Sequence, residues 1–314
     1  MGSTLLAGAS LGEVRSDAYD ELALLEGNAA EHGLTWSGPP EVARREVALS
    51  GGGVVSALQW GGGPPVALLV HGSAQNAHTW DTVALALRRP LVAVDLPGHG
   101  QSTWRPDHDY SPGVLAGALA EAAVALAPSA RLVVGMSLGG LAAISLAARR
   151  PRLVPALVIV DITPGVDARK AKAITDFVSG PERFGSFEEI LERTVLHNPG
   201  RSVESLRRGV LHNAREMPDG SWAWRWDPVR HGGPPGTEPG QARLALWEAL
   251  GTTRMPLTLV RGSLSPVVDD RDVEELLERR PDARMVTVEG AGHSVQGDRP
   301  LELAAVLAPL LPAG

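Results

Sequence analysis

The stretch from Leu132 to Gly140 constrains the fold of this chain more than any other feature. It reads Leu-Val-Val-Gly-Met-Ser-Leu-Gly-Gly, and an alanine- and leucine-rich helical pattern follows at once, from Leu141 to Arg149. We expect a strand, a sharp turn and a helix, with Ser137 at the apex of the turn. Small residues must flank such a turn, because its apex is strained and neighbouring backbone comes close. The turn exposes a hydroxyl at a strand end, beside the positive end of a helix.

Short, wholly apolar segments alternate with helical patterns on both sides of this turn. A hairpin is predicted at 42–49 and 54–60, and strands at 65–70, 90–95, 131–135, 156–160, 257–261 and 284–289. This alternation implies a mostly parallel sheet with helices on both faces. Chemistry in such sheets lies at the carboxyl ends of the strands, where His71, Asp95, Ser137 and Asp161 fall.

The alternation stops between residues 163 and 240. Helical patterns at 169–178, 187–195 and 203–216 follow one another there without an apolar strand, and a tryptophan cluster and a Gly-Pro-rich linker at 232–240 come next. We expect a mainly helical cap at 163–240, inserted between two parts of an α/β core at 42–162 and 241–314. Residues 1–41 are predicted to form an N-terminal helical extension. A chain of 314 residues has room for one large domain with such an insertion.

Composition excludes several classes of protein. The net charge of −7 comes without long runs of one sign, so no nucleic acid partner is expected. The absence of cysteine excludes disulfides, thiol catalysis and cysteine–zinc sites. The nine histidines lack a spacing such as His-x-x-x-His, so neither a metal nor a cofactor is expected. No basic leader or membrane-length apolar segment is present, and we expect a cytoplasmic monomer or homodimer that acts on a small molecule.

A serine nucleophile needs a base within hydrogen-bond reach, and the base needs an acid that orients it. His293 follows the last predicted strand in a Gly-Ala-Gly-His sequence, and we interpret it as the base rather than as a surface-loop histidine. The acid that orients it is either Asp161 or one of Asp269 and Asp270. The latter two begin a predicted helix, where an aspartate is explained as an N-cap. We favour Asp161, although it could instead fix the turn that follows it.

The tetrahedral intermediate of such a reaction needs preorganised N–H donors. The backbone N–H of Leu138, at the start of the helix, is one candidate, and that of Ser73, after the strand that ends in His71-Gly72, is the other. We expect the pocket for the substrate to be lined by Gly72, His78 and Met136.

Three tryptophans in the predicted cap alternate with a period of two: Trp222, Trp224 and Trp226. In a strand this period puts all three indoles on one face. They could form an apolar wall for a bulky substrate or pin the cap to the sheet. We favour anchoring, because large aromatic side chains serve burial first.

Four motifs, in this order, make the chain resemble the α/β-hydrolase fold family from about Val42 to Leu311. They are His71-Gly72 with Trp80 downstream, Asp95-Leu96-Pro97-Gly98-His99-Gly100-Gln101-Ser102, Gly135-Met136-Ser137-Leu138-Gly139-Gly140, and Gly290-Ala291-Gly292-His293. The resemblance implies Ser137 as nucleophile, His293 as base, and an oxyanion hole from Ser73 and Leu138.

The chain departs from the family pattern at the acid. Most members carry it after the strand that is here predicted at 257–261, where this chain has Ser265. A branch of esterase-like members carries it after the strand that follows the nucleophile, in an Asp-x-x-Pro context. Asp161-Ile162-Thr163-Pro164 is similar to that branch.

We therefore expect a serine esterase or lactonase that acts through an acyl-enzyme on a medium to large, apolar or aromatic substrate. One alternative is hydrolysis of a carbon–carbon bond in a vinylogous diketone by the same triad, with the region of Arg225 and His78 binding an anionic tail. An alternative of another class is a non-catalytic ligand-binding protein of the same fold.

Overall fold

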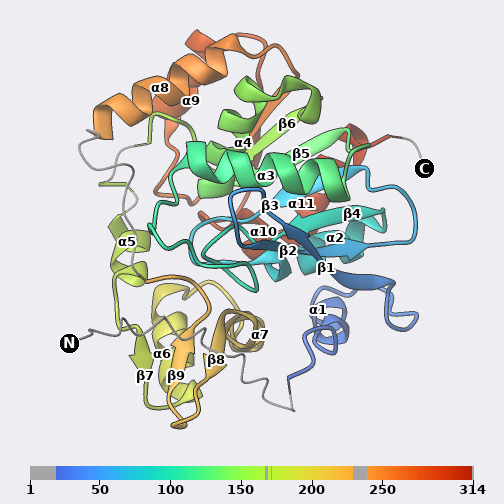
Figure 1. Ribbon diagram of the computed structural model, residues 1–314, viewed down its shortest axis with the longest axis vertical. Coiled ribbons are helices and arrows are strands. Elements are labelled where there is room, and N and C mark those ends of the chain that lie inside the picture. The colour runs from blue at the N-terminus through green and yellow to red at the C-terminus, as the bar shows by residue number, and fades with distance from the viewer. Residues whose placement is uncertain (1–18, 167–168, 171, 229–238, 313–314) are drawn as a thin grey trace, which may run out of the picture.

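An eight-stranded sheet forms the centre of the protein and has helices on both faces (Figure 1). The computed structural model describes residues 19–166, 169–170, 172–228 and 239–312. Part of the predicted N-terminal extension and most of the predicted 232–240 linker lie outside these residues. The strands lie in the order β1-β2-β4-β3-β5-β6-β10-β11.

Only the strands at one edge of this sheet are antiparallel. Strands β1 (Val42–Ala48) and β2 (Val54–Trp60) form the predicted hairpin, and β2 also pairs antiparallel with β4. The remaining neighbours are parallel and comprise β4 (Leu91–Val94), β3 (Ala67–Val70), β5 (Leu132–Met136), β6 (Leu157–Val160), β10 (Leu257–Gly262) and β11 (Arg284–Val288). The predicted fold, a mostly parallel sheet between helices, is confirmed.

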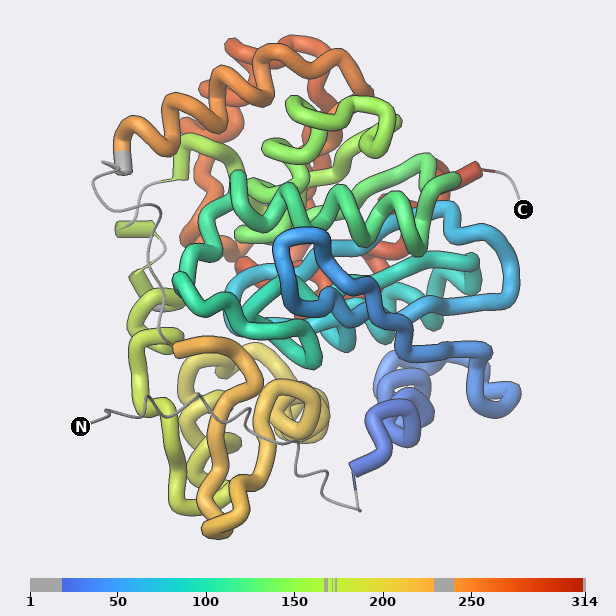
Figure 2. The backbone as a smooth tube through the Cα atoms, in the orientation of Figure 1, coloured from blue at the N-terminus to red at the C-terminus, as the bar shows by residue number. Residues whose placement is uncertain are grey.

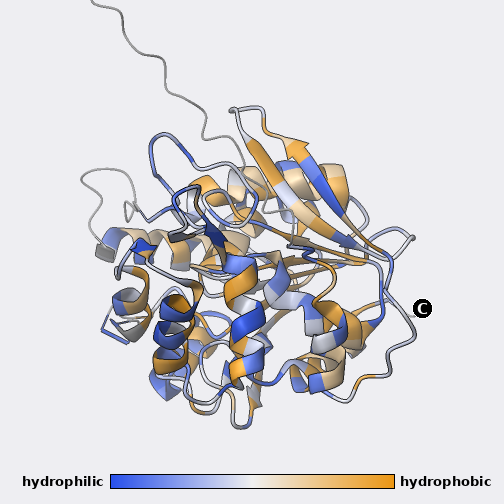
Figure 3. Cartoon of the chain, turned by 90° about the horizontal axis from the view of Figure 1, so that it is seen from below, coloured by the Kyte–Doolittle hydropathy of each residue, from blue (hydrophilic) through white to orange (hydrophobic). Residues whose placement is uncertain are grey.

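The central strands are apolar throughout because both of their faces are covered. Along β5, Val133 packs into one core while Val134 and Met136 pack into the other. Each such side chain contributes about 1.5–3 kcal/mol when it leaves water. The helices in view carry apolar and polar turns side by side (Figure 3).

Among the residues that the structure describes, four helices cover each face of the sheet. One face carries α3 (Pro112–Leu126), α4 (Leu138–Arg149), α8 (Pro239–Thr252) and α9 (Asp270–Arg279). The other carries α1 (Leu25–Glu31), α2 (Asp81–Leu87), α10 (Val295–Asp298) and α11 (Pro300–Leu307). Three single-turn helices complete the core: η1 (Ala77–Trp80), η2 (Pro151–Leu153) and η3 (Ala308–Leu310). In the described part of the chain, no helix has the length and apolar character needed to cross a bilayer.

The segment between β6 and α8 forms a separate lobe, coloured yellow-green to light orange in Figure 2. It contains the helices α5 (Lys172–Val178), α6 (Phe187–His197) and α7 (Val203–Asn213). It also contains a three-stranded antiparallel sheet of β7 (Arg183–Phe184), β9 (Trp222–Trp224) and β8 (Ala214–Glu216). The sequence predicted mainly helix here and missed this sheet.

The helix predicted up to residue 216 ends instead at Asn213, which corrects the sequence-based boundary. Residues 214–216 become a strand because they pair with β9, a partner that local helical periodicity does not reveal.

Three contacts of Asp227 join the end of this lobe to the core. The Asp227 backbone N–H donates to the Gly98 carbonyl at 2.8 Å. Its carboxylate accepts from the Tyr110 hydroxyl and pairs with His108 Nδ1, each at 2.6 Å. The lobe is therefore bound to the loop that follows β4.

Candidate active site

Ser137 lies at the sharp turn between β5 and α4, as the sequence predicted. Its backbone has φ 49° and ψ −119°, a conformation that costs about 1–3 kcal/mol in a residue other than glycine. The turn is held because the Ser137 N–H donates to the Val160 carbonyl at 3.1 Å and the Ser137 carbonyl accepts from Leu141 N–H at 3.1 Å. The hydroxyl is thereby fixed at the carboxyl end of the sheet.

Close backbone packing explains the glycines around this serine. A Cβ on Gly135 would lie 2.5 Å from the Gly139 carbonyl oxygen, and one on Gly139 would lie 2.4 Å from the His71 carbonyl oxygen. A Cβ on Gly72 would lie 2.4 Å from Met136 Sδ and 3.2 Å from Ser137 Cβ. The loop after β3 therefore lies directly against the turn that carries the serine.

Asp161, at the end of the neighbouring strand β6, contacts the predicted base. Its side chain is fully buried, and its Oδ2 lies 2.7 Å from His293 Nδ1. Its Oδ1 accepts from the Gly262 N–H at 3.0 Å. The backbone of Asp161 is left-handed, with φ 52°, and its N–H donates to the Val260 carbonyl at 2.7 Å. His293 and the Gly262 N–H therefore hold the carboxylate, and the Val260 carbonyl holds the backbone, before any substrate binds.

The two alternative aspartates lie elsewhere. Asp269 is the N-cap of α9 and forms a capping box with Asp272, which is the role that the sequence also allowed for it. Asp270 is exposed and forms an ion pair with Arg261. Of the three candidates for the acid, the structure brings only Asp161 to His293.

Ser265 occupies the loop after β10 and touches the same carboxylate. Its hydroxyl donates to Asp161 Oδ2 and accepts from the Val267 N–H at 3.1 Å. A hydroxyl therefore lies where the family resemblance would place an acid. It donates a hydrogen bond to the carboxylate of Asp161, at the end of the neighbouring strand β6. The sequence identified this serine as a departure and gave no hint of its partner.

His293 reaches Asp161 because the loop after β11 folds back across the sheet. A Cβ on Gly262 would lie 2.3 Å from the Gly292 carbonyl oxygen and 2.4 Å from that of Ala291. The loop therefore lies on the end of β10, the strand between β11 and β6. No hydrogen bond joins His293 to the Ser137 hydroxyl among the described residues. In free enzymes this contact is often long and closes only with substrate.

The loop after β3, which carries Ser73, is fixed by hydrogen bonds on both sides. His71 Nε2 accepts from the Leu96 N–H at 2.9 Å, so its proton is on Nδ1, which donates to the Gly72 carbonyl at 2.7 Å. Gln75 Oε1 accepts from the Gly72 N–H at 3.2 Å, and Gln75 Nε2 donates to the Ser294 hydroxyl at 3.4 Å. Gln75 thus connects this loop to the residue after His293, a role that the sequence did not predict.

The structure places His78 in a polar cluster rather than in contact with Ser137. Its Nδ1 lies 2.9 Å from Asp81 Oδ2, its Nε2 lies 3.2 Å from Glu21 Oε2, and its ring stacks on His212 at 3.8 Å. Burial lowers the pKa of His78, but the charge and hydrogen bond of Asp81 outweigh it and raise that pKa to about 9. Burial lowers the pKa of His212 well below its ordinary value.

Two of the three tryptophans form the core of the inserted lobe. Trp224 and Trp226 stack at 4.0 Å and are buried together with Phe184, and the half-buried Phe177 packs against them. Ala74 of the loop after β3 belongs to the same apolar cluster. Trp222 is half-buried against Phe187. The cluster therefore packs the lobe against the loop that carries Ser73.

The sequence of this chain is similar to those of known hydrolases. A family model described as "Alpha/beta hydrolase family" matches residues 67–306. Esterase Rv0045c of Mycobacterium tuberculosis is 45% identical over 296 residues, which are 92% of this chain and 94% of the relative. Pimeloyl-[acyl-carrier protein] methyl ester esterase of Aeromonas salmonicida is 31% identical, over 76% of this chain and 92% of that protein.

A solved structure agrees with these matches. It is described as "Transition metal inhibition and structural refinement of the M. tuberculosis esterase, Rv0045c". It superposes with a TM-score of 0.83 at 44% identity and covers 93% of this chain and 99% of that one.

Proposed function

This chain belongs to the alpha/beta hydrolase family and hydrolyses ester bonds, and we propose that Ser137, His293 and Asp161 carry out that reaction. The observation that supports this assignment is the 2.7 Å contact between His293 Nδ1 and the buried Asp161 carboxylate, beside the strand that ends at Ser137. A neutral histidine held in this way has its proton on Nδ1 and a free lone pair on Nε2 for the serine proton.

The proposed reaction has two steps. Ser137 Oγ attacks the acyl carbon while His293 Nε2 takes its proton, and the backbone N–H groups of Ser73 and Leu138 bind the oxyanion. The alcohol leaves with the proton from His293, and an acyl-serine remains. A water molecule, deprotonated by His293, then attacks the acyl-serine, and His293 returns that proton to Ser137 Oγ as the acid leaves. Asp161 stays ionised and stabilises the imidazolium that forms in each step.

Covalent labelling tests the nucleophile directly. A fluorophosphonate probe should label the chain at Ser137, and peptide mapping should locate the adduct there. Ser137→Ala should abolish both labelling and ester turnover. Ser145→Ala is the matched control, because Ser145 lies on the same helix α4, and it should label as the native chain does. Labelling that persists in Ser137→Ala would refute the assignment.

We propose that the preferred substrates are esters or lactones with a medium to large apolar or aromatic group. The packing of the Trp224 and Trp226 cluster against Ala74 supports this, because it places apolar side chains of the lobe beside the loop that carries the proposed oxyanion donor Ser73. A panel of aryl esters of rising acyl length, macrolactones and vinylogous diketones tests the proposal. Fastest turnover of acetate esters or of the diketones would contradict it.

We also propose that transition metals inhibit this esterase, as the description of the related structure says of that protein. The test is ester turnover in rising ZnCl2, followed by EDTA. Inhibition that EDTA reverses supports the proposal, and turnover that is indifferent to Zn²⁺ contradicts it.

A further inference from the structure

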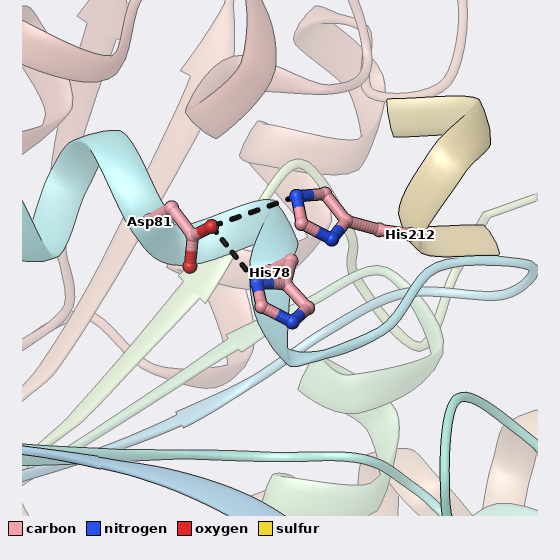
Figure 4. A group of neighbouring side chains, drawn as sticks. All are labelled: His78, Asp81 and His212. Atoms are coloured by element: carbon pink, nitrogen blue, oxygen red, sulfur yellow. Dashed lines mark hydrogen bonds and ion pairs between the residues drawn. The ribbon is translucent and has the colours of Figure 1, made fainter. Parts of the chain in front are cut away.

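Three buried side chains from two distant parts of the chain meet where the inserted lobe contacts the core (Figure 4). His78 and Asp81 come from η1 and α2, and His212 comes from α7 of the lobe. Each offers one ligand atom, and these atoms all lie within 4.8 Å of one another. Asp81 Oδ2 is central, at 2.9 Å from His78 Nδ1 and 3.9 Å from His212 Nε2.

The cluster contains two buried polar atoms that no neighbour satisfies. His212 Nε2 and Asp81 Oδ1 have no hydrogen-bond partner among the described residues. The two residues are 6% and 1% exposed. Buried polar atoms in folded proteins almost always have partners, so two such atoms in one cluster point to an additional ligand.

The outer nitrogen of each histidine already has a partner of the kind found behind metal ligands. His78 Nε2 lies 3.2 Å from Glu21 Oε2 and 3.2 Å from Arg44 Nη2, and His212 Nδ1 faces the Tyr19 hydroxyl at 2.5 Å. Carboxylates and other oxygens in this position fix the tautomer that directs the inner nitrogen to a metal. The inner atoms are thus two imidazole nitrogens and one carboxylate oxygen.

We propose that His78, Asp81 and His212 bind one divalent transition-metal ion, such as Zn²⁺ or Co²⁺. Imidazole and carboxylate ligands suit these ions, whereas Mg²⁺ and Ca²⁺ prefer oxygen alone. Metal–ligand distances near 2.1 Å require ligand atoms about 3.4 Å apart, close to the spacing already present. Binding displaces the proton between His78 and Asp81, and it tilts the two imidazoles out of their parallel stack, which has an interplanar angle of 9°. A water molecule completes a tetrahedral site.

Asn76 links this site to the loop after β3, which carries the proposed oxyanion donor Ser73. Its Nδ2 donates to the His212 carbonyl at 2.9 Å and to Asn213 Oδ1 at 2.8 Å. Its Oδ1 accepts from the His78 N–H at 2.9 Å, which caps η1. Asn76 lies three residues after Ser73, so tilting the His78 and His212 rings strains this loop. The proposed metal site rests on the proposed inhibition and assigns that inhibition to this cluster. We expect the bound ion to lower kcat and to leave KM for the ester nearly unchanged.

Metal binding can be measured without turnover. ZnCl2 is titrated calorimetrically into the full chain after chelation, and the visible spectrum is recorded with CoCl2. We expect one ion per chain and a cobalt spectrum of four-coordinate type. His212→Gln should weaken Zn²⁺ binding at least about tenfold and remove the cobalt spectrum. His197→Gln, an exposed histidine on α6 of the same lobe, is the matched control and should bind as the native chain does.

A second variant and the kinetics of inhibition test the same metal site. Tyr19→Phe removes only the hydroxyl behind His212, and it should weaken Zn²⁺ binding about tenfold if His212→Gln does not fold. Unchanged binding in a folded His212→Gln, or no binding by the native chain, would overturn the proposal. Zn²⁺ inhibition that competes with ester and persists in His212→Gln would place the ion elsewhere and overturn it too. A chain that binds Zn²⁺ here but cleaves no ester would refute the proposed catalytic residues alone.

Discussion

Adding one methyl group at Gly262 should disable the base while leaving the fold intact. In Gly262→Ala the new Cβ would lie 2.3 Å from the Gly292 carbonyl oxygen, whereas real Cβ contacts essentially never fall below 3.0 Å. The loop that carries His293 must therefore retreat by about 0.7 Å or more. The contact between His293 Nδ1 and Asp161 Oδ2, now 2.7 Å, would lengthen to about 3.4 Å, at the limit of a hydrogen bond.

The expected loss of activity follows from this displacement. A misplacement of about 1 Å costs about 10²-fold in rate, so kcat of Gly262→Ala should fall about 30- to 100-fold. Overpacking should also lower the free energy of unfolding by about 1–3 kcal/mol. Steady-state kinetics with an aryl ester measures the first effect, and urea unfolding measures the second.

A second glycine supplies the control for this experiment. Gly251 lies near the end of α8 with open space around its Cβ position. Gly251→Ala should keep the native kcat and raise helix stability by about 0.5–1 kcal/mol. A folded Gly262→Ala with kcat within twofold of the native value would refute the argument that this glycine positions His293.

Three further predictions concern the acid and the polar cluster. Asp161→Asn should lower kcat by about 10³- to 10⁴-fold in aryl-ester assays, because the amide favours the wrong tautomer of His293, whereas Asp270→Asn should keep the native kcat. Ser265→Ala should lower the free energy of unfolding by about 1–2 kcal/mol in urea titrations, because Asp161 loses a buried hydrogen-bond donor. The pKa of His78 is about 9 in the folded chain and near 6.5 when unfolded. The stability that this histidine contributes is therefore fully present below about pH 6.5 and lost as pH rises through about 9. With EDTA present, Tm of the native chain should fall more between these pH values than Tm of His78→Gln.

Each of these three predictions has an outcome that would contradict it. Equal kcat losses in Asp161→Asn and Asp270→Asn would show that neither aspartate acts specifically on the base. A Ser265→Ala chain as stable as the native one would mean that water replaces the lost donor without cost. Parallel Tm curves for the native chain and His78→Gln would show that the proton of His78 contributes nothing to stability.

The local sequence pattern was sufficient to predict the strand and the helix that position Ser137. The turn between β5 and α4 depends on residues adjacent in sequence, and the apolar runs of the parallel strands are continuous because both faces are buried. Strand β8 depends on pairing with β9, and local periodicity continued the preceding helix through it. The same limit applies to Gln75, whose partner Ser294 lies 219 residues away.

The order of short apolar strands, with small residues at the serine turn, determined the sheet and the edge at which Ser137 lies, because backbone sterics and burial act between near neighbours. The contact of His293 with Asp161 spans 132 residues, and the meeting of His78 with His212 spans 134. Both are set by how loops fold back over strand ends and how the lobe packs on the core. The strand-end positions in the sequence favoured Asp161 for the first contact but left Asp269 and Asp270 open, and only the structure decided among them. The histidine cluster had no counterpart in any sequence motif, because spacing along the chain does not show which loop the lobe packs against.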